Sequence, residues 1–502
     1  MIRLPQIFGN KMVLQGGTPV RIWGEATGEQ VSVSIQGESI CAPVKEGRFE
    51  ALLPALKFSG SETLTVTGDE TLVFHDVAVG EVWLAAGQSN MEFQMYFDRD
   101  FDGEPLGVQD IRYFGVPEIG CEEALERFDY SDWGFWRKND SRENLKYFTA
   151  VGYYFARIIA GQTGHVVGVI NCSWGGTASL PWIDPAYIRD TPGVLWIEEY
   201  EKAIAGASED ELRDEYLGNL MSARGKQFDD PGSCGLLFGM SHQKQMEMMS
   251  HMPPMPAGSH PPYQGAPGRL FESMVNRVAP YTVQGVLWYQ GESDSMHPEL
   301  YGFMLTGLIR CWRGLWREEL PFYLVQLPSF GQWLMADGHA YPEIRQQQEQ
   351  VADVMEKTFL VSTMDCGMLW DIHPKRKKPV GERLALMALK ETYGCDVLAG
   401  SPRPVEVSSE SGKIAIRFSD AEGGLVWKEE LAGQDAVSLC IDGCSADDFW
   451  WEVSGEELVI ASADLKPGSK AQVKLAARGY DPVNIFNQAG FTLRPFTVNV
   501  KI

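Results

Sequence analysis

Hydrophobic and polar residues change their spacing twice along the chain. From 1 to about 77, short runs alternate every second residue between Gly-containing turns; Val31, Val33 and Ile35, for example, alternate with Ser32 and Ser34. This pattern predicts a small β-sandwich-like module over 1–77. The alternation returns after 400, at 414–418, 458–461 and 473–475, and predicts a second β module over 401–502.

The region between the two modules, 78–400, has a different pattern. Compact β-branched runs predict strands at 81–86, 166–171, 285–289, 321–326 and 359–363. Helical periodicity predicts helices at 145–159, 300–315 and 381–393. Such alternation is typical of an open, mostly parallel α/β sheet. An insert over about 196–268 interrupts it, with a solvated surface helix predicted at 197–218 and a loop rich in Met and Pro after it.

Small and reactive residues gather where several of these strands end. The clusters are Gly-Gln-Ser-Asn-Met at 87–91, Ser-Trp-Gly-Gly-Thr at 173–177, Gln-Gly-Glu-Ser-Asp at 290–294 and, after a short loop, Asp-Ile-His-Pro at 371–374. In an open α/β sheet the ligand crevice lies outside the carboxyl ends of the strands. We therefore expect the four clusters to converge.

This set of residues can perform acyl transfer. Ser89 follows a strand at the start of a helix, where its hydroxyl can act as a nucleophile once a His accepts its proton. His373 is the preferred base, because Asp371 lies two residues before it and residues i and i+2 of an extended segment point to the same side. His297 is the remaining alternative, and its place beside Pro298 favours a role in lining the loop.

A tetrahedral oxyanion needs fixed hydrogen-bond donors. The backbone N–H of Ser89, an N–H of the Gly175-Gly176 turn and the side-chain amide of Gln290 can supply them. Glu292 has two interpretations, as a second carboxylate that orients the imidazole or as an acceptor for backbone donors of its own loop.

Other reaction classes lack their motifs. Met91 stands where the second Gly of a Gly-x-Ser-x-Gly nucleophile elbow would be. No Gly-x-Gly-x-x-Gly follows a strand, and the chain has no Walker loop and no His-Glu-x-x-His. Dinucleotide, nucleotide and zinc-peptidase functions are therefore disfavoured.

Composition narrows the partners and the location. Asp and Glu number 68 against 43 Lys and Arg, a net charge of −25 that repels nucleic acid. No apolar run is long enough to span a membrane, and no export signal is seen at the amino terminus. The nine Cys form no Cys-x-x-Cys pair, which predicts neither a disulfide framework nor a metal site. We expect a cytoplasmic protein, or a secreted or periplasmic one if a signal peptide has been removed.

The ordered motifs resemble those of the SGNH-type carbohydrate esterases, and specifically of the sialate O-acetylesterase group. The resemblance implies a flavodoxin-like, three-layer α/β/α domain over 78–400 between the two β modules. It implies that Ser89 is the nucleophile and that Gly176, or Gly175, donates to the oxyanion. Gln290 takes the place of an Asn that is the side-chain donor in the wider superfamily. In the last block His373 becomes the base and Asp371 its orienting carboxylate; the wider superfamily spaces this pair one residue further apart, so Glu292 stays an alternative.

The resemblance also implies the reaction, which is hydrolysis of acetyl esters on sugar hydroxyls without a metal or organic cofactor. The expected partner is an acetylated sugar or oligosaccharide, with sialate O-acetylesterase activity preferred. Two alternatives stay open: a deacetylase of neutral hemicellulose fragments such as acetylated xylan or mannan, and a non-catalytic carbohydrate-binding protein. Assembly into a homo-oligomer is left open. Two hypotheses concern the substrate: Trp174 and Trp182 hold a sugar ring, and the basic run 375–378 meets the carboxylate of an acidic sugar.

Overall fold

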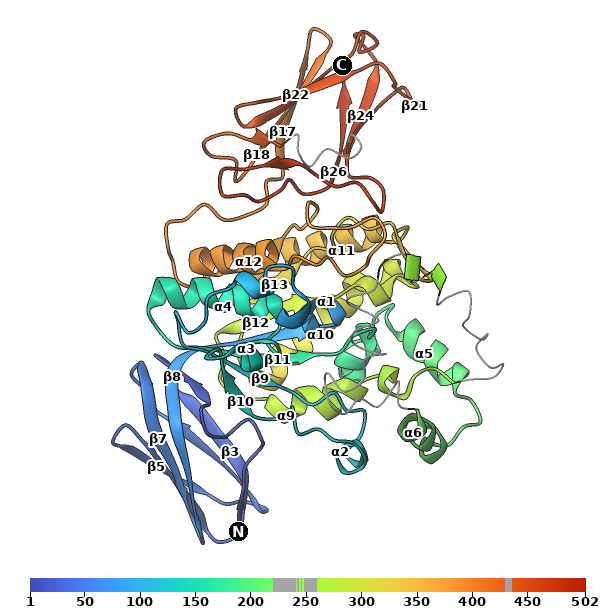
Figure 1. Ribbon diagram of the computed structural model, residues 1–502. Coiled ribbons are helices and arrows are strands. Elements are labelled where there is room, and N and C mark those ends of the chain that lie inside the picture. The colour runs from blue at the N-terminus through green and yellow to red at the C-terminus, as the bar shows by residue number, and fades with distance from the viewer. Residues whose placement is uncertain (220–240, 242, 245, 248–259, 429–435) are drawn as a thin grey trace. The chain divides into compact units, whose positions relative to one another are not determined.

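The computed structural model describes residues 1–219, 241, 243–244, 246–247, 260–428 and 436–502 (Figure 1). They form two compact units. The first contains the described residues of Met1–Met240, Pro253–Ser293 and Phe303–Phe322, and the second those of Ser241–Met252, Asp294–Gly302 and Tyr323–Ile502.

The first unit begins with the predicted β module. One antiparallel sheet contains β1 (Ile2–Arg3), β3 (Val20–Ala26) and β6 (Arg48–Leu53), and β4 (Gln30–Ile35) pairs with β5 (Glu38–Pro43) and β7 (Ser59–Thr67). The alternating Val31, Val33 and Ile35 are all buried. The periodicity of two in this part of the sequence is therefore confirmed.

A single long strand, β8 (Thr71–Gly87), joins this module to the α/β sheet. Its first half pairs antiparallel with β7, and its second half, from Glu81 to Gly87, pairs parallel with β11 (Val167–Ser173). The buried guanidinium of Arg112 fixes the junction, because it binds the carboxylates of Asp76 and Asp110 at 3.2 and 2.9 Å. The boundary predicted at residue 77 thus falls inside a continuous strand.

The central strands of the first unit lie in the order β10-β9-β11-β8-β12. The bounds of the new strands are Ile111–Gly115 for β9, Trp136–Lys138 for β10 and Gly285–Tyr289 for β12. All neighbours are parallel except β10. Helix α4 (Ala150–Thr163) packs on β9 and β11 and is capped by the Thr149 side chain. Parallel strands that are buried on both sides read as continuous apolar runs, which is why the predictions for β8, β11 and β12 are confirmed.

Helix α10 (Tyr301–Trp316) matches the helix predicted at 300–315. Its Trp312 packs edge-to-face on Trp288 of β12, with the ring centroids 5.6 Å apart. The helix predicted at 145–159 is present in two pieces, α3 (Arg142–Leu145) and α4, since Thr149 starts a new helix with its hydroxyl as the cap.

The second unit contains the remaining predicted strands, β13 (Phe322–Val325) and β16 (Thr358–Val361). Helices α11 (Tyr341–Val354) and α12 (Lys378–Glu391) both contact β16. Helix α12 begins three residues before the predicted start because Pro379 fits the first turn of a helix.

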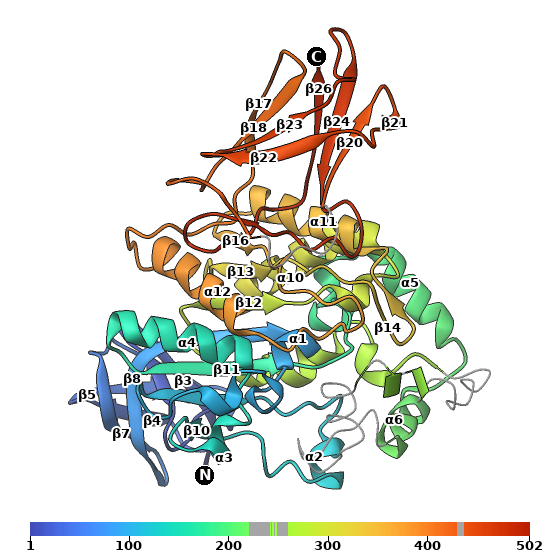
Figure 2. The same cartoon turned by 45° about the horizontal axis from the view of Figure 1, so that its top comes forward.

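The chain ends in a β-sandwich within the second unit (Figure 2). One sheet has the order β17-β18-β23-β22 and the other β21-β20-β24-β26. Inward residues of both sheets, such as Ile416, Leu458, Leu439 and Val473, share one apolar core. In the first sheet the strands are β17 (Pro404–Glu410), β18 (Lys413–Phe418), β23 (Glu457–Ala461) and β22 (Trp450–Ser454). In the second they are β21 (Cys444–Ser445), β20 (Val437–Ile441), β24 (Lys470–Leu475) and β26 (Phe496–Lys501).

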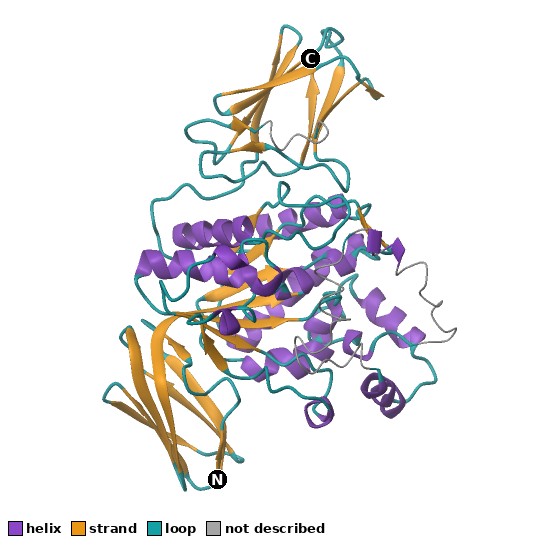
Figure 3. Ribbon diagram, viewed as in Figure 1, coloured by secondary structure: helices purple, strands orange, loops and turns teal. Residues whose placement is uncertain are grey.

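The predicted insert contains two helices in its described part, α5 (Val194–Ala203) and α6 (Glu209–Gly218), where the sequence predicted one (Figure 3). Ser208 starts the second helix, because it caps α6 in a capping box with Glu211. Most of the Met- and Pro-rich loop lies outside the described residues. No described helix is both long and apolar enough to cross a membrane.

Candidate active site

Ser89 lies directly beyond the carboxyl end of β8. The preceding Gly87 has φ +140°, and a Cβ at that position would lie 2.1 Å from the carbonyl oxygen of Tyr289 on β12. Only glycine allows this conformation and this approach of two backbones. The chain then turns into the short helix α1 (Ser89–Glu92), whose first residue is Ser89, only 7% exposed.

The turn after β11 packs against Ser89. A Cβ on Gly175 would lie 3.1 Å from the Cβ of Ser89 and 2.9 Å from a carboxylate oxygen of Glu92. The Gly175 N–H donates to Glu92 Oε2 at 2.6 Å. Gly176 has φ +76° and its Cβ position faces open space. Since Glu92 occupies the N–H of Gly175, Gly176 is the better oxyanion donor of the pair.

The loop after β12 is held against Ser89 by the residue before it, Gln88. Its side-chain carbonyl accepts hydrogen bonds from the Gln290 amide and from the Ser293 N–H, both at 3.2 Å. Gln290 Nε2 is also 3.3 Å from the carbonyl oxygen of Thr177. Gln290 lies at the predicted place, but its amide hydrogens are used within the protein, so donation to an oxyanion requires one of these bonds to be exchanged.

Glu292 supports helix α1, which begins at Ser89. The side-chain amide of Asn90 donates to Glu292 Oε1 at 2.5 Å, and both residues are buried. Gln88, Asn90 and Glu92 are thus site residues that the sequence reasoning did not single out. Their position within or beside the 87–91 motif was the available signal.

The second unit supplies the predicted acid–base pair. Asp371 Oδ1 accepts the backbone N–H of His373 at 2.8 Å and lies 3.7 Å from His373 Nδ1. Its other oxygen is 2.9 Å from the Lys375 ammonium. Both members of the pair are buried. The two-residue spacing therefore places the carboxylate beside the imidazole.

Burial controls the charge of this pair. Desolvation lowers the pKa of His373 to about 4, with Lys377 and Lys375 acting in the same direction and Asp371 opposing them. Hydrogen bonding to His373 and the charge of Lys375 hold the pKa of Asp371 below its usual value, despite its burial. The imidazole is therefore neutral near pH 7, as a general base must be.

The basic run 375–378 does not form an open cationic patch. Lys375 pairs with Asp371, and Lys377 is fully buried. Arg376 alone among the four is classed as exposed. The hypothesis that the whole run meets an acidic sugar is therefore wrong for the buried Lys377 and for Lys375, whose ammonium is paired with Asp371.

The hypothesis that Trp174 and Trp182 hold a sugar ring is also wrong. Trp174 and Trp182 are 2% and 0% exposed, and the Trp182 indole donates to Thr177. Trp333 is better placed than either to contact a sugar held near His373, since the two rings meet edge-to-face with centroids 5.0 Å apart. Trp370, the residue before Asp371, is 46% exposed.

The other candidate base has different surroundings. His297 Nδ1 lies 3.7 Å from Glu299, a largely exposed carboxylate in a 3₁₀ turn.

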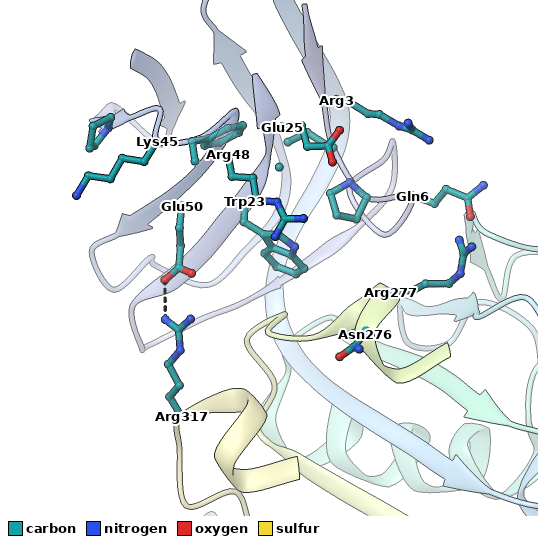
Figure 4. A pocket seen from close by; sticks show the side chains of 15 residues that line it. Arg3, Gln6, Trp23, Glu25, Lys45, Arg48, Glu50, Asn276, Arg277 and Arg317 are labelled. Carbon is teal, nitrogen blue, oxygen red and sulfur yellow. Dashed lines mark hydrogen bonds and ion pairs between the residues drawn. The ribbon is translucent and has the colours of Figure 1, made fainter. Parts of the chain in front are cut away.

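Outside the motif residues, a cavity of about 950 Å³ in the first unit is lined by Arg3, Trp23, Arg48, Arg277 and Arg317, among others (Figure 4). None of the predicted reacting groups lines this cavity, so acetyl transfer is not assigned to it.

Comparison with known proteins shows which proteins this chain is similar to. Residues 233–390 match the family described as "Carbohydrate esterase, sialic acid-specific acetylesterase". The chain is 27% identical to the sialate O-acetylesterase of Mus musculus, over 89% of this chain and 83% of that protein. It is 28% identical to the Rattus norvegicus sialate O-acetylesterase, over 78% and 74% of the two chains.

The fold has a solved counterpart. The crystal structure of a carbohydrate acetylesterase from Xanthomonas citri superposes with a TM-score of 0.75, covers 99% of both chains and is 24% identical. The family model and the named relatives confirm the predicted resemblance: the chain is similar to carbohydrate esterases. Within that class, the similarity is to the sialate O-acetylesterases.

Proposed function

We propose that this protein is a carbohydrate O-acetylesterase, with O-acetylated sialic acid as the preferred substrate, built on an SGNH-type, three-layer α/β/α scaffold. One observation carries the proposal. Ser89 stands at the end of β8 with the 173–177 turn packed on its Cβ and with Gln88 and Asn90 tied to the 290–293 loop. The matched family and the named relatives support the substrate class.

In the first step, Ser89 Oγ attacks the carbonyl carbon of the acetyl ester while its proton passes to the imidazole of His373. The oxyanion of the tetrahedral intermediate is stabilised by the N–H groups of Ser89 and Gly176. When the ester C–O bond breaks, His373 returns the proton to the sugar oxygen. The products are the free sugar hydroxyl and an acetyl group on Ser89.

In the second step, water attacks the acetyl-Ser89 ester and gives up its proton to His373. Collapse of the second tetrahedral intermediate releases acetic acid, and Ser89 recovers its proton from His373. The mechanism as written requires no metal or organic cofactor. It pairs Ser89 of the first unit with His373 of the second on the basis of the motif order, and kinetics must test that pairing.

Asp371 is the proposed orienting carboxylate. It accepts the His373 N–H, lies 3.7 Å from the imidazole nitrogen and has a lowered pKa, so it is ionised at neutral pH. Glu292 is proposed instead to support the Ser89 helix, because its Oε1 binds Asn90. Cytoplasmic location and oligomeric state remain predictions.

Acetate release tests the function. Wild type and Ser89→Ala should be compared on O-acetylated sialic acid, acetylated xylo-oligosaccharides and acetylated manno-oligosaccharides. We expect release by wild type, fastest from the sialic acid, and loss of at least a thousandfold in the variant. Faster release from the xylan or mannan fragments would favour the hemicellulose alternative. No release from any of the three would contradict the esterase and favour a binding protein.

A further inference from the structure

The C-terminal sandwich presents tryptophans that its core does not bury. Trp427, on β19 (Val426–Trp427), and Trp450, on β22, are 46% and 48% exposed. With Phe449 and Trp451 they line a hollow of about 770 Å³, which we call the aromatic hollow. Large aromatic residues that stay exposed together mark binding surfaces more often than structural ones.

The rings of the hollow are held in place. Trp427 and Trp451 meet edge-to-face, with centroids 5.8 Å apart and planes at 81°. Phe449 and Trp451 also pack against the sandwich core. The Lys413 ammonium lies 5.4 Å from the centroid of the Trp450 ring. Fixed aromatic faces suit a ligand with flat apolar faces, since little side-chain freedom is lost on binding.

The polar groups of the hollow are acidic. Asp447 and Glu452 line it, and within the part of the chain that the structure describes neither carboxylate forms an ion pair. Carboxylates accept hydrogen bonds from hydroxyl groups and repel other carboxylates. Aromatic faces beside carboxylates therefore match a pyranose with many hydroxyls and no charge, and they disfavour an acidic sugar.

We propose that the aromatic hollow binds a neutral oligosaccharide and is a second saccharide site, distinct from the proposed acetyl-ester site. Its volume is in the range of pockets that hold small ligands. The strand that contributes most to it, β22, is at the edge of its sheet (Figure 2). This binding goes beyond the proposed esterase function and does not depend on it.

Isothermal titration of the full chain tests the proposal. The probes are xylohexaose, mannohexaose and an oligomer of sialic acid, none of which carries an O-acetyl ester, so that failure of the esterase assignment leaves this test intact. We expect one of the neutral hexaoses to bind and the oligosialic acid not to bind. Trp427→Ala and Trp450→Ala should each weaken binding by about tenfold. Val405→Ala, which removes a similarly exposed apolar side chain of the same sandwich, should leave binding unchanged.

Two further variants guard against loss of folding. Trp450→Phe keeps a flat ring and should retain most of the binding. Glu452→Gln removes one repelling charge and should make weak binding of oligosialic acid measurable, whereas wild type shows none. Absence of binding by both hexaoses, equal binding by folded Trp→Ala variants, or a preference of wild type for oligosialic acid would overturn the proposal. A dimer that Trp450→Ala abolishes, without saccharide binding, would replace it with self-association.

Discussion

The environment of His373 determines when the proposed base can work. An exposed His would lose its proton near pH 6.5, but burial lowers the pKa of His373 to about 4. A general base must be neutral in the free enzyme. The residue therefore keeps its catalytic form well into the acid range, even though Asp371 stabilises the protonated form.

This gives a prediction about pH. The acid limb of kcat/KM should have its midpoint near pH 4, because His373 is neutral above its lowered pKa and protonated below it. A pH–rate profile on a neutral acetyl ester measures the limb without titration of the substrate. Lys375→Met should move the limb upward, since the Lys375 charge lowers the pKa of His373, and Lys375→Arg should leave it in place. A midpoint at 6.5 in wild type would contradict the role of burial.

A second residue-level prediction separates the two carboxylates. Asp371→Asn should lower kcat by roughly 100- to 10,000-fold, as expected when the orienting acceptor of a catalytic His is lost. Glu292→Gln should cost less than about tenfold, because its amide oxygen can still accept from Asn90. Steady-state kinetics with a thermal-unfolding control for each variant measures both effects. The reverse ranking would assign the orienting role to Glu292.

At the scale of elements, the position of Ser89 depends on how closely three chain segments approach one another. Gly87 lets β8 pass against the backbone of β12, and Gly175 lets the 173–177 turn pack on Ser89. A residue with a side chain at either position could not replace the glycine without moving the neighbouring segment. The end of β8 is thus fixed by its neighbours more than by its own four-residue helix.

Gly175→Ala tests this dependence. The added methyl would lie 2.9 Å from Glu92 Oε2 and 3.1 Å from the Ser89 Cβ, so the Glu92 carboxylate or the turn must shift, which disturbs the Gly175–Glu92 hydrogen bond and the packing on Ser89. We expect kcat to fall by at least about tenfold, since a small misplacement near the reacting atoms is costly. The matched control is Gly218→Ala, where nothing lies within 4 Å of the new methyl. Equal activity of the two variants would show that the turn does not position Ser89.

At the scale of the whole molecule, charge opposes the preferred substrate. The net charge of −25 repels an anionic sugar at long range, and the basic run 375–378 offsets it only in part, because Lys375 is paired and Lys377 is buried. Recognition of a sialic acid must then depend on short-range contacts.

The salt dependence of KM follows from this charge. Raising the ionic strength from about 0.01 M to 0.15 M shortens the Debye length from roughly 30 Å to about 8 Å, so repulsion is screened. We expect KM for O-acetylated sialic acid to fall severalfold, and KM for an acetylated neutral sugar to stay constant. Initial-rate measurements across the salt series check this. A rise of KM with salt for the acidic substrate would indicate a local cationic site that outweighs the net charge.

The sequence by itself determined the elements and the types of chemical group. Strands β8, β11 and β12 were predictable because buried parallel strands are continuous apolar runs, and the sandwich strands because a half-buried strand alternates. Strand ends collect reactive groups, and the structure places Ser89 at the end of β8 as the sequence predicted. The contact between Asp371 and His373 was predictable because their spacing is local.

Tertiary structure alone decided what each group contacts. The pKa of His373 is set by its burial, and the amide of Gln290 takes its hydrogen-bond acceptors from Gln88 and Thr177. Trp174, Trp182 and Lys377 are buried because residues far away in the sequence pack on them. Solvation and hydrogen-bond partners are set by neighbours in space, and no pattern along the chain encodes them. The same reason explains why β8 crosses a boundary that the periodicity placed at residue 77: backbone pairing continues wherever a partner strand is available on either side.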